Sequence, residues 1–320
     1  MPVITYQDTD YECMDTETVL ECLTRHGILI PSSCHSGVCQ SCMMLALQGK
    51  PSADSQQGLK NTLQANNYFL ACMCRPQDDL TVTLPGDDIT HRISAQVVDK
   101  TMLNNTIVKL HLVTELPFDY RPGQFINFYR YDGLARSYSL ASVPSLNEPL
   151  ELHVRRMEGG QMSGWIHNEL KVGDHVNIEG PLGNCFYLPD RPEQPLLLAG
   201  TGCGIAPLWG IMRDALEQGH GGPIYLFHGS FTKNGLYLVD EMREYAERFP
   251  NLHYMPCVDE SDDDNEFTMG RIDKVVTTTL PTLKGWRVFL CGVPEMVKGM
   301  QRNCFIAGAS MQDIYADPFG

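Results

Sequence analysis

The spacing of hydrophobic residues changes character twice along the chain. Over the first 88 residues, short alternating stretches around one helical stretch predict a small α+β domain. The helix is expected to begin at Thr16, a residue type that favours the N-cap, and to stop at Gly27. The polar, turn-rich segment Pro85–Asp88 marks the end of this domain. The predicted strands are 3–6, 11–14, 43–47 and 80–84.

From residue 89 to residue 190, many short strand patterns are separated by glycine and proline turns. Regularly spaced short strands of this kind are typical of an antiparallel β-barrel. One helical stretch, Ser163–Leu170, interrupts them. The predicted strands are 93–98, 107–112, 125–128, 150–154 and 175–178.

Beyond residue 191, apolar strands alternate with longer helical patterns, which predicts a parallel sheet with helices on both faces. The acidic run Asp259–Glu266 is expected to be an exposed loop. The predicted fold is therefore multidomain, α+β and α/β, with domains at 1–88, 89–190 and 191–320. The predicted elements of the third domain are strands 195–199, 224–228, 253–258 and 287–291 and helices 208–217, 239–248, 271–279 and 294–307.

The first domain contains a cysteine motif with metal-ligand spacing. Cys34, Cys39 and Cys42 follow the pattern C-x4-C-x2-C, and Cys72 comes after 29 intervening residues. This is the ligand order of a plant-type [2Fe–2S] cluster. A four-cysteine zinc site usually pairs two C-x2-C knuckles, and only Cys39 and Cys42 have that spacing here. The spacing favours the cluster, with Cys74 as the alternative to Cys72 for the fourth ligand.

Two motifs in the second domain suit a dinucleotide. Arg136–Ser139 combines a guanidinium that can bind phosphate, a ring that can stack on a flavin and small hydroxyl donors. Alone, this motif also fits an ordinary surface strand. About twenty residues later, His153–Arg156 precedes Gly159–Ser163, where glycines lead into a helix N-terminus and create an anion site. Together, the two motifs fit the pyrophosphate of FAD rather than FMN.

The third domain has two glycine motifs at the ends of strands. Gly200–Pro207 follows an apolar strand and precedes a helix, the context of a phosphate-binding loop. Its spacing, G-x-G-x-G-x-x-P, differs from the usual G-x-G-x-x-G, so a structural tight turn is also consistent with it. Cys291–Met296 follows a second strand. Open α/β sheets bind ligands at the carboxyl ends of their strands, where both motifs are expected.

The net charge, the apolar runs and the cysteine content of the chain exclude some classes of function. The 320-residue chain has a net charge of −15, which argues against nucleic-acid binding. No apolar run approaches the ~20 residues that span a membrane, and the N-terminus lacks signal-peptide features. Twelve cysteines then argue for reduced thiols, metal ligation and a cytoplasmic location. Residues 1–90 carry eleven Asp and Glu against four Lys and Arg, which suits either solubility or steering toward a basic redox partner.

The combined motifs resemble the ferredoxin–NADP reductase superfamily. With a plant-type ferredoxin at the N-terminus, the whole chain resembles the NADH-dependent reductase components of bacterial ring-hydroxylating dioxygenases and multicomponent monooxygenases. The resemblance implies a β-grasp ferredoxin domain, an FAD-binding barrel and a nicotinamide domain. Leu70-Ala71-Cys72 resembles the corresponding ferredoxin tripeptide, which favours Cys72 over Cys74.

The resemblance also implies roles for individual residues. Arg136 and Ser163 would bind the flavin pyrophosphate, Tyr138 would stack on the isoalloxazine, Cys291 would lie by the hydride path and Phe319 would contact the flavin. The expected metal ligands are Cys34, Cys39, Cys42 and Cys72. The expected catalytic residues are Ser139 (near the flavin N5), Cys291 and Phe319. The expected cofactor-binding residues are Arg136, Ser137, Tyr138, Ser139, His153, Val154, Gly160, Gln161, Met162, Ser163, Gly200, Thr201, Gly202, Gly204, Cys291, Gly292 and Phe319.

Electron counting then predicts the function. A nicotinamide gives up two electrons as a hydride, a [2Fe–2S] cluster accepts one, and a flavin can do both. We expect a monomer that relays electrons from NAD(P)H through FAD and the cluster to an oxygenase or another redox protein. Alternatives are a reductase with a non-oxygenase acceptor, such as a deoxysugar dehydratase, and a pure electron carrier. The acidic run after Val258 predicts a preference for NADH, although Ser230 and Lys233 leave NADPH possible.

Overall fold

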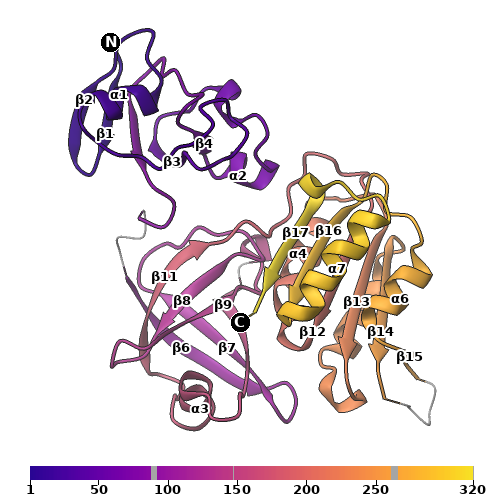
Figure 1. The fold of residues 1–320 in the computed structure, drawn as a ribbon. Coiled ribbons are helices and arrows are strands. Elements are labelled where there is room, and N and C mark those ends of the chain that lie inside the picture. The colour runs from indigo at the N-terminus through magenta and orange to yellow at the C-terminus, as the bar shows by residue number, and fades with distance from the viewer. Residues whose placement is uncertain (88–91, 147, 261–265, 320) are drawn as a thin grey trace. The chain divides into compact units, whose positions relative to one another are not determined.

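The computed structural model describes residues 1–87, 92–146, 148–260 and 266–319. The chain divides into two compact units, residues 1–91 and residues 92–320 (Figure 1). The first unit contains Cys34, Cys39, Cys42 and Cys72. The second contains two sheets, and one hydrophobic cluster joins residues of both, such as Ile107 and Leu198. It includes the boundary predicted at residue 190.

The first unit is built on a five-stranded mixed sheet with the order β2-β1-β5-β3-β4. Strand β5 is central, because it pairs parallel with β1 and antiparallel with β3. Helix α1 (Val19–Arg25) contributes Val19, Leu20, Cys22 and Leu23 to the core of this unit. The result is a β-grasp fold, as predicted. The other elements are β1 (Val3–Tyr6), β2 (Thr9–Glu12), β3 (Met43–Gln48), η1 (Ala53–Gln56), α2 (Asn61–Ala65), β4 (Tyr68–Leu70) and β5 (Leu80–Thr83).

The predicted helix start at Thr16 is wrong, because Thr18 is the N-cap of α1. The Thr18 hydroxyl accepts a hydrogen bond from the Glu21 N–H (3.2 Å), and the Glu21 carboxylate accepts one from the Thr18 N–H (2.8 Å). This reciprocal capping box needs a glutamate three residues after the cap. Thr16 is followed at that distance by Val19, which has no acceptor.

The second unit begins with a six-stranded antiparallel sheet of order β10-β7-β6-β11-β8-β9. A bridge between Leu140, which follows β9, and Leu152 in β10 joins the two edges and closes the barrel. Helix α3 (Gln161–Asn168) begins two residues before the predicted start and buries Met162 and Ile166 against the barrel core. The strands are β6 (Ile93–Met102), β7 (Ile107–Thr114), β8 (Phe125–Tyr129), β9 (Ala135–Ser139), β10 (Leu150–Arg155) and β11 (His175–Leu182).

The second sheet of this unit is parallel, with six strands in the order β15-β14-β13-β12-β16-β17. Helices α4 and α5 pack into one core and α6 and α7 into another, so both faces are covered as predicted (Figure 1). The elements are β12 (Leu196–Thr201), α4 (Ile205–Glu217), β13 (Ile224–Ser230), α5 (Val239–Arg248), β14 (Leu252–Val258), β15 (Thr268–Met269), α6 (Ile272–Thr279), β16 (Arg287–Gly292), α7 (Pro294–Ile306) and β17 (Ile314–Pro318).

Strand β17 was not predicted and matters for the site. It pairs with β16 so that Asp317 lies opposite Cys291. Its carboxyl end reaches β9 of the barrel (Figure 1), and there the Ser139 hydroxyl donates to the Asp317 carboxylate. The C-terminal segment therefore joins the two sheets of the second unit.

In the acidic run, Asp259, Glu260 and Glu266 are exposed as predicted, whereas residues 261–265 lie outside the described part of the chain. No helix among the described residues is long and apolar enough to cross a membrane.

Candidate functional site

The loop from Cys34 to Cys42 directs backbone N–H groups at its own sulfurs. The Cys34 Sγ accepts from the N–H groups of Cys39 (3.3 Å) and Ser36 (3.4 Å), and the Cys39 Sγ accepts from the Cys34 N–H (3.5 Å). The Cys39 and Ser36 N–H groups lower the pKa of the Cys34 thiol to about 5. The loop is therefore arranged to hold thiolates, which is the form that binds iron.

Cys72 belongs to the same group of thiols. Its sulfur interacts with the Cys42 thiol and the Gly37 N–H, and burial is the main cause that raises its pKa to about 11. Cys34 and Cys39 are exposed, whereas Cys42 and Cys72 are buried.

Cys74, the alternative fourth ligand, interacts with different groups. Its thiol is fully buried and hydrogen bonds to Ser52 and Ser55. Cys72 interacts with both Cys42 and Cys34, and Cys34 interacts with Cys39. This donor set suits a [2Fe–2S] cluster.

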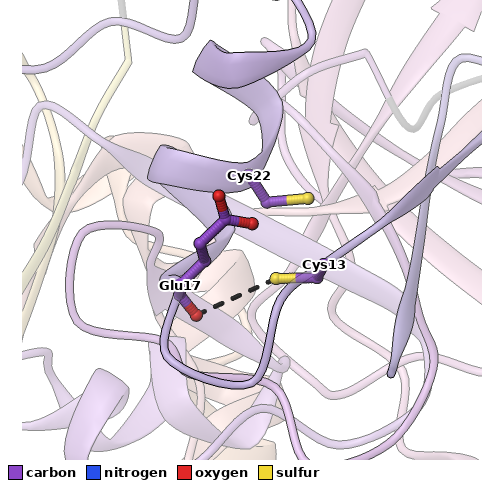
Figure 2. A group of neighbouring side chains, drawn as sticks. All are labelled: Cys13, Glu17 and Cys22. Carbon is purple, nitrogen blue, oxygen red and sulfur yellow. Dashed lines mark hydrogen bonds between the residues drawn. The ribbon is translucent and has the colours of Figure 1, made fainter.

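A second pair of thiols lies elsewhere in the first unit (Figure 2). Ligand atoms of Cys13, Glu17 and Cys22 lie within 4.8 Å of one another. The Glu17 carboxylate is already bound by the Arg25 Nε (2.6 Å), the Arg25 Nη2 (2.9 Å) and the Met14 N–H (3.0 Å). Burial raises the pKa of Cys13 to about 12, and its thiol donates to the Glu17 carbonyl. These are protonated core thiols beside a neutralised carboxylate, so they offer no free ligand set.

The expected flavin phosphate site is a cavity of about 530 Å³ at the start of α3. Gly160 occupies the N-cap, and a Cβ there would lie 2.4 Å from the Ser163 Oγ, so the position requires glycine. Without a capping side chain, the N–H groups of the first turn are left for a ligand. The Ser163 hydroxyl accepts from the Met157 N–H (3.1 Å) and so shapes this loop. The cavity is lined by Thr106, Arg156, Met157, Glu158, Gly159, Gly160 and Gly164.

On β9, the Arg136 and Ser137 side chains are exposed, Tyr138 is half-buried and Ser139 is buried. The Arg136 Nη1 donates to the Ala135 carbonyl (2.7 Å), which leaves its other donors facing solvent. The Ser137 hydroxyl donates to the Asn127 side chain (2.9 Å). The exposed guanidinium and the half-buried ring are consistent with a bound pyrophosphate and a stacked ring.

Three other expected flavin residues, His153, Val154 and Met162, have buried side chains. Val154 and Met162 lie in the barrel core, which leaves only their backbones for a cofactor. The His153 imidazole is fully buried between the Glu151 carboxylate (2.7 Å) and the Tyr237 hydroxyl (3.1 Å). Its side chain links the barrel to the parallel sheet. The Gln161 side chain is exposed.

A larger cavity of about 680 Å³ lies at the carboxyl ends of the parallel strands. Thr201 and Gly202 line it, and Gly202 has a φ of +55°. A Cβ at Gly204 would lie 2.2 Å from the Cys291 carbonyl oxygen, so this glycine lets the loop pack against β16. The Thr201 Oγ1 is buried without a hydrogen-bond partner, which suits a nucleotide that would supply one.

Two of the charged residues that line this cavity are Arg155, whose place here was not predicted, and Asp259, which begins the acidic run that predicts a preference for NADH. The Arg155 Nη1 lies 3.3 Å from where a Gly202 Cβ would be, so a cation adjoins the glycine loop. Among the described residues of the acidic run, Asp259 lines the cavity. Arg155 is the exposed last residue of β10, whose five preceding residues are all buried, so no alternation along this strand marks it.

Ser139, Asp317 and Cys291 meet where the barrel joins the parallel sheet. The Ser139 hydroxyl donates to the Asp317 carboxylate (3.2 Å), and Asp317 lies beside the Cys291 thiol. Burial raises the pKa of Asp317 to about 6, although the Ser139 hydrogen bond opposes the rise. Phe319 packs against the core that contains Cys291, and its N–H donates to the Gly292 carbonyl (2.8 Å). Three predicted residues and the unpredicted Asp317 thus form one cluster.

Models of known protein families match three successive segments of the chain. A family model for a 2Fe-2S iron-sulfur cluster binding domain matches residues 4–77. Models for an oxidoreductase FAD-binding domain and an oxidoreductase NAD-binding domain match residues 94–187 and 198–302. The protein is therefore an iron–sulfur flavoprotein reductase, with a [2Fe–2S] cluster, FAD and a nicotinamide nucleotide as cofactors.

Relatives and solved structures match nearly the whole chain. A Ralstonia reductase component of naphthalene 1,2-dioxygenase/salicylate 5-hydroxylase systems is 31% identical over 307 residues, which cover 94% of this chain and 93% of the relative. The reductase subunit of an Amycolatopsis aromatic O-demethylase is 32% identical, covering 90% and 89%. The crystal structure of an Amycolatopsis cytochrome P450 reductase superposes with a TM-score of 0.69 at 29% identity, covering 100% and 99%. The chain belongs to the family of ferredoxin–NAD(P)(+) reductase components of oxygenase systems.

Proposed function

We propose that this protein takes electrons from NADH and delivers them to an oxygenase. The observation that carries the proposal is the presence, in one chain, of the four cysteine thiols of the first unit, the anion site at α3 and the nucleotide cavity. When bound, FAD supplies the conversion between a two-electron donor and a one-electron acceptor. The acceptor is inferred from relatives that are named as components of dioxygenase and monooxygenase systems.

We assign the residues to four tasks. Cys34, Cys39, Cys42 and Cys72 would ligate the cluster. Arg136 and the N–H groups after Gly160 would bind the pyrophosphate of FAD, and Thr201 and Gly202 would hold the nicotinamide nucleotide. The cluster of Ser139, Asp317, Cys291 and Phe319 would exclude water from the reacting rings and hold a proton between Ser139 and Asp317. The monomeric state and the cytoplasmic location stay predictions.

Arg136→Ala is expected to weaken FAD retention, because a charge-assisted contact to pyrophosphate is worth ~1.5–3 kcal/mol, or roughly a 10- to 150-fold rise in the dissociation constant. The measurement is FAD titration of the apoprotein followed by flavin fluorescence. Arg248→Ala is the matched control, since Arg248 is exposed at the end of α5. Equal FAD affinity in Arg136→Ala and the parent protein would remove Arg136 from the site.

The proposal also predicts that NADH is preferred over NADPH by roughly tenfold or more in kcat/KM, since Asp259 lines the cavity and repels a 2′-phosphate. A ribose 2′-hydroxyl can instead donate to that carboxylate. Steady-state reduction of cytochrome c with each nucleotide tests this choice. A higher kcat/KM for NADPH would contradict it.

A further inference from the structure

The order of strands in the parallel sheet sets the direction in which a nicotinamide dinucleotide would lie across it. The reacting ring would lie by Cys291 and Asp317, which pair at the ends of β16 and β17. The glycine loop with Gly202 follows β12, the next strand in the sheet, and β13 and β14 continue the order beyond it. A dinucleotide whose phosphates lie at the glycine loop would therefore place its adenosine over the ends of β13 and β14.

Phe231 lies at this outer part of the cavity. It follows the last residue of β13, lines the cavity and has 68% of its surface exposed. Single exposed apolar side chains are ordinary on a protein surface. This one borders the nucleotide cavity, and among the described residues that line the cavity it is the only aromatic one. Its exposed surface is therefore available to a ligand bound there.

Hydrogen bonds and close packing hold the backbone around Phe231. The Glu260 N–H donates to the Phe231 carbonyl (3.0 Å), and the Asp259 N–H donates to the Ser230 carbonyl (3.1 Å). A Cβ at Gly235 would lie 2.1 Å from the Ser230 Oγ, so a glycine is required where the loop folds back against the end of β13. Because the ring stands on an ordered strand end, less entropy is lost when a ligand packs against it.

The other side chains at this end of the cavity include charged groups. Asp259 and Asp273 line the cavity, as does Arg271, whose Nε donates to the Asp273 carboxylate (3.2 Å). Carboxylates can accept hydrogen bonds from the ribose hydroxyls and from the exocyclic amine of adenine. The flat faces of adenine need an apolar or aromatic partner, which these groups do not provide and the Phe231 ring does.

We propose that the Phe231 ring stacks on the adenine of NADH and binds the adenosine half of the nucleotide. The inference rests on the proposed function, because it assumes that NADH is the electron donor. Since β12 separates β13 from β16, Phe231 would contribute to nucleotide affinity and would not act on the hydride step at Cys291.

Phe231→Ala is expected to raise the KM for NADH by roughly tenfold, the effect of removing a ring that stacks on a base, and to change kcat by less than about twofold. The inhibition constant of 5′-AMP, which measures binding without turnover, should rise by a similar factor. Reduced nicotinamide mononucleotide lacks the adenosine half, so its kcat/KM should be the same in the variant and the parent protein. The measurement is steady-state reduction of cytochrome c with each donor.

Two further variants distinguish stacking from a general effect of the substitution. Phe231→Tyr keeps the ring and should retain the parent values for NADH and 5′-AMP. Phe305→Ala removes another exposed phenylalanine, near the end of α7, and should also leave both values unchanged. The proposal is overturned if Phe231→Ala impairs the mononucleotide as much as NADH, or if Phe231→Tyr loses as much affinity as Phe231→Ala.

The parent protein separates failure of this inference from failure of the proposed function. If NADH does not reduce the parent protein, the proposed donor is wrong. If NADH reduces it and Phe231→Ala leaves both the KM for NADH and the inhibition by 5′-AMP unchanged, the donor stands and the role of Phe231 is wrong.

Discussion

Cys72→Ser is expected to abolish or grossly alter the [2Fe–2S] absorption and EPR spectra, whereas Cys74→Ser should leave both largely intact. The Cys72 thiol lies with the Cys42 thiol and the Gly37 N–H, and a serine oxygen is a much harder ligand for iron. The Cys74 thiol lies in the core against Ser52 and Ser55, where a hydroxyl can replace its hydrogen bonds. The measurement is iron and sulfide content together with the visible spectrum of each purified variant.

Flavin content provides the internal control for this pair, because FAD binds in the other unit of the chain. Both variants should retain FAD and should still be reduced by NADH at the flavin. The ligand assignment fails if Cys74→Ser loses the cluster while Cys72→Ser keeps it.

Asp317→Asn is expected to slow flavin reduction by NADH by roughly 10- to 100-fold at pH 8. The carboxylate is partly buried beside Cys291. A nicotinamide that gives up a hydride here would become a cation, and an ionised carboxylate would stabilise that charge. Because the pKa of Asp317 is raised to about 6, the carboxylate is protonated below that pH and ionised above it. In the parent protein the rate should therefore rise with pH through about 6, and stopped-flow measurements should show that the variant lacks this rise.

Two controls accompany this second prediction: the pH dependence of the rate in Ser139→Ala and the stability of Asp317→Asn. Ser139→Ala removes the hydrogen bond but keeps the carboxylate, so the rate should still rise with pH. The pKa of Asp317 lies above its ordinary value of 3.8, so the folded state binds the proton more tightly between that value and about 6. The stability contribution of this group is therefore present at low pH and is lost as pH rises through that window. Asp317→Asn should then be at least as stable as the parent at pH 8, and a loss of stability there would contradict the assignment.

The parts of the fold that sequence reasoning predicted are those with strong local signals. Short alternating or apolar stretches predicted most strands of both sheets in the second unit, although β15 and β17 were missed. The glycine motifs of the parallel sheet fell at strand ends as expected. Short elements such as β4 and α2 were missed, because three to five residues offer too little periodicity to distinguish strand from helix. The start of α1 was misplaced because two threonines precede it, and only the capping box distinguishes them.

The site was predictable where a motif is contiguous and unpredictable where it depends on tertiary pairing. Spacing placed Cys34, Cys39 and Cys42 in one loop, but the position of Cys72 relative to Cys74 depends on how the segment after β4 packs. Asp317 had no local motif and gains its environment from the pairing of β17 with β16. The place of Phe231 on the nucleotide cavity likewise depends on how β13 and β14 pair.

Anaerobic titration of the purified holoprotein with NADH tests the relay most directly. The account predicts that about one and a half equivalents of NADH fully reduce the protein, because FAD takes two electrons and the cluster one. The visible absorption of both cofactors should bleach, and the EPR signal of a reduced [2Fe–2S] cluster should appear. A flavin that is reduced while the cluster stays oxidised, or a protein that NADH does not reduce, would contradict the account.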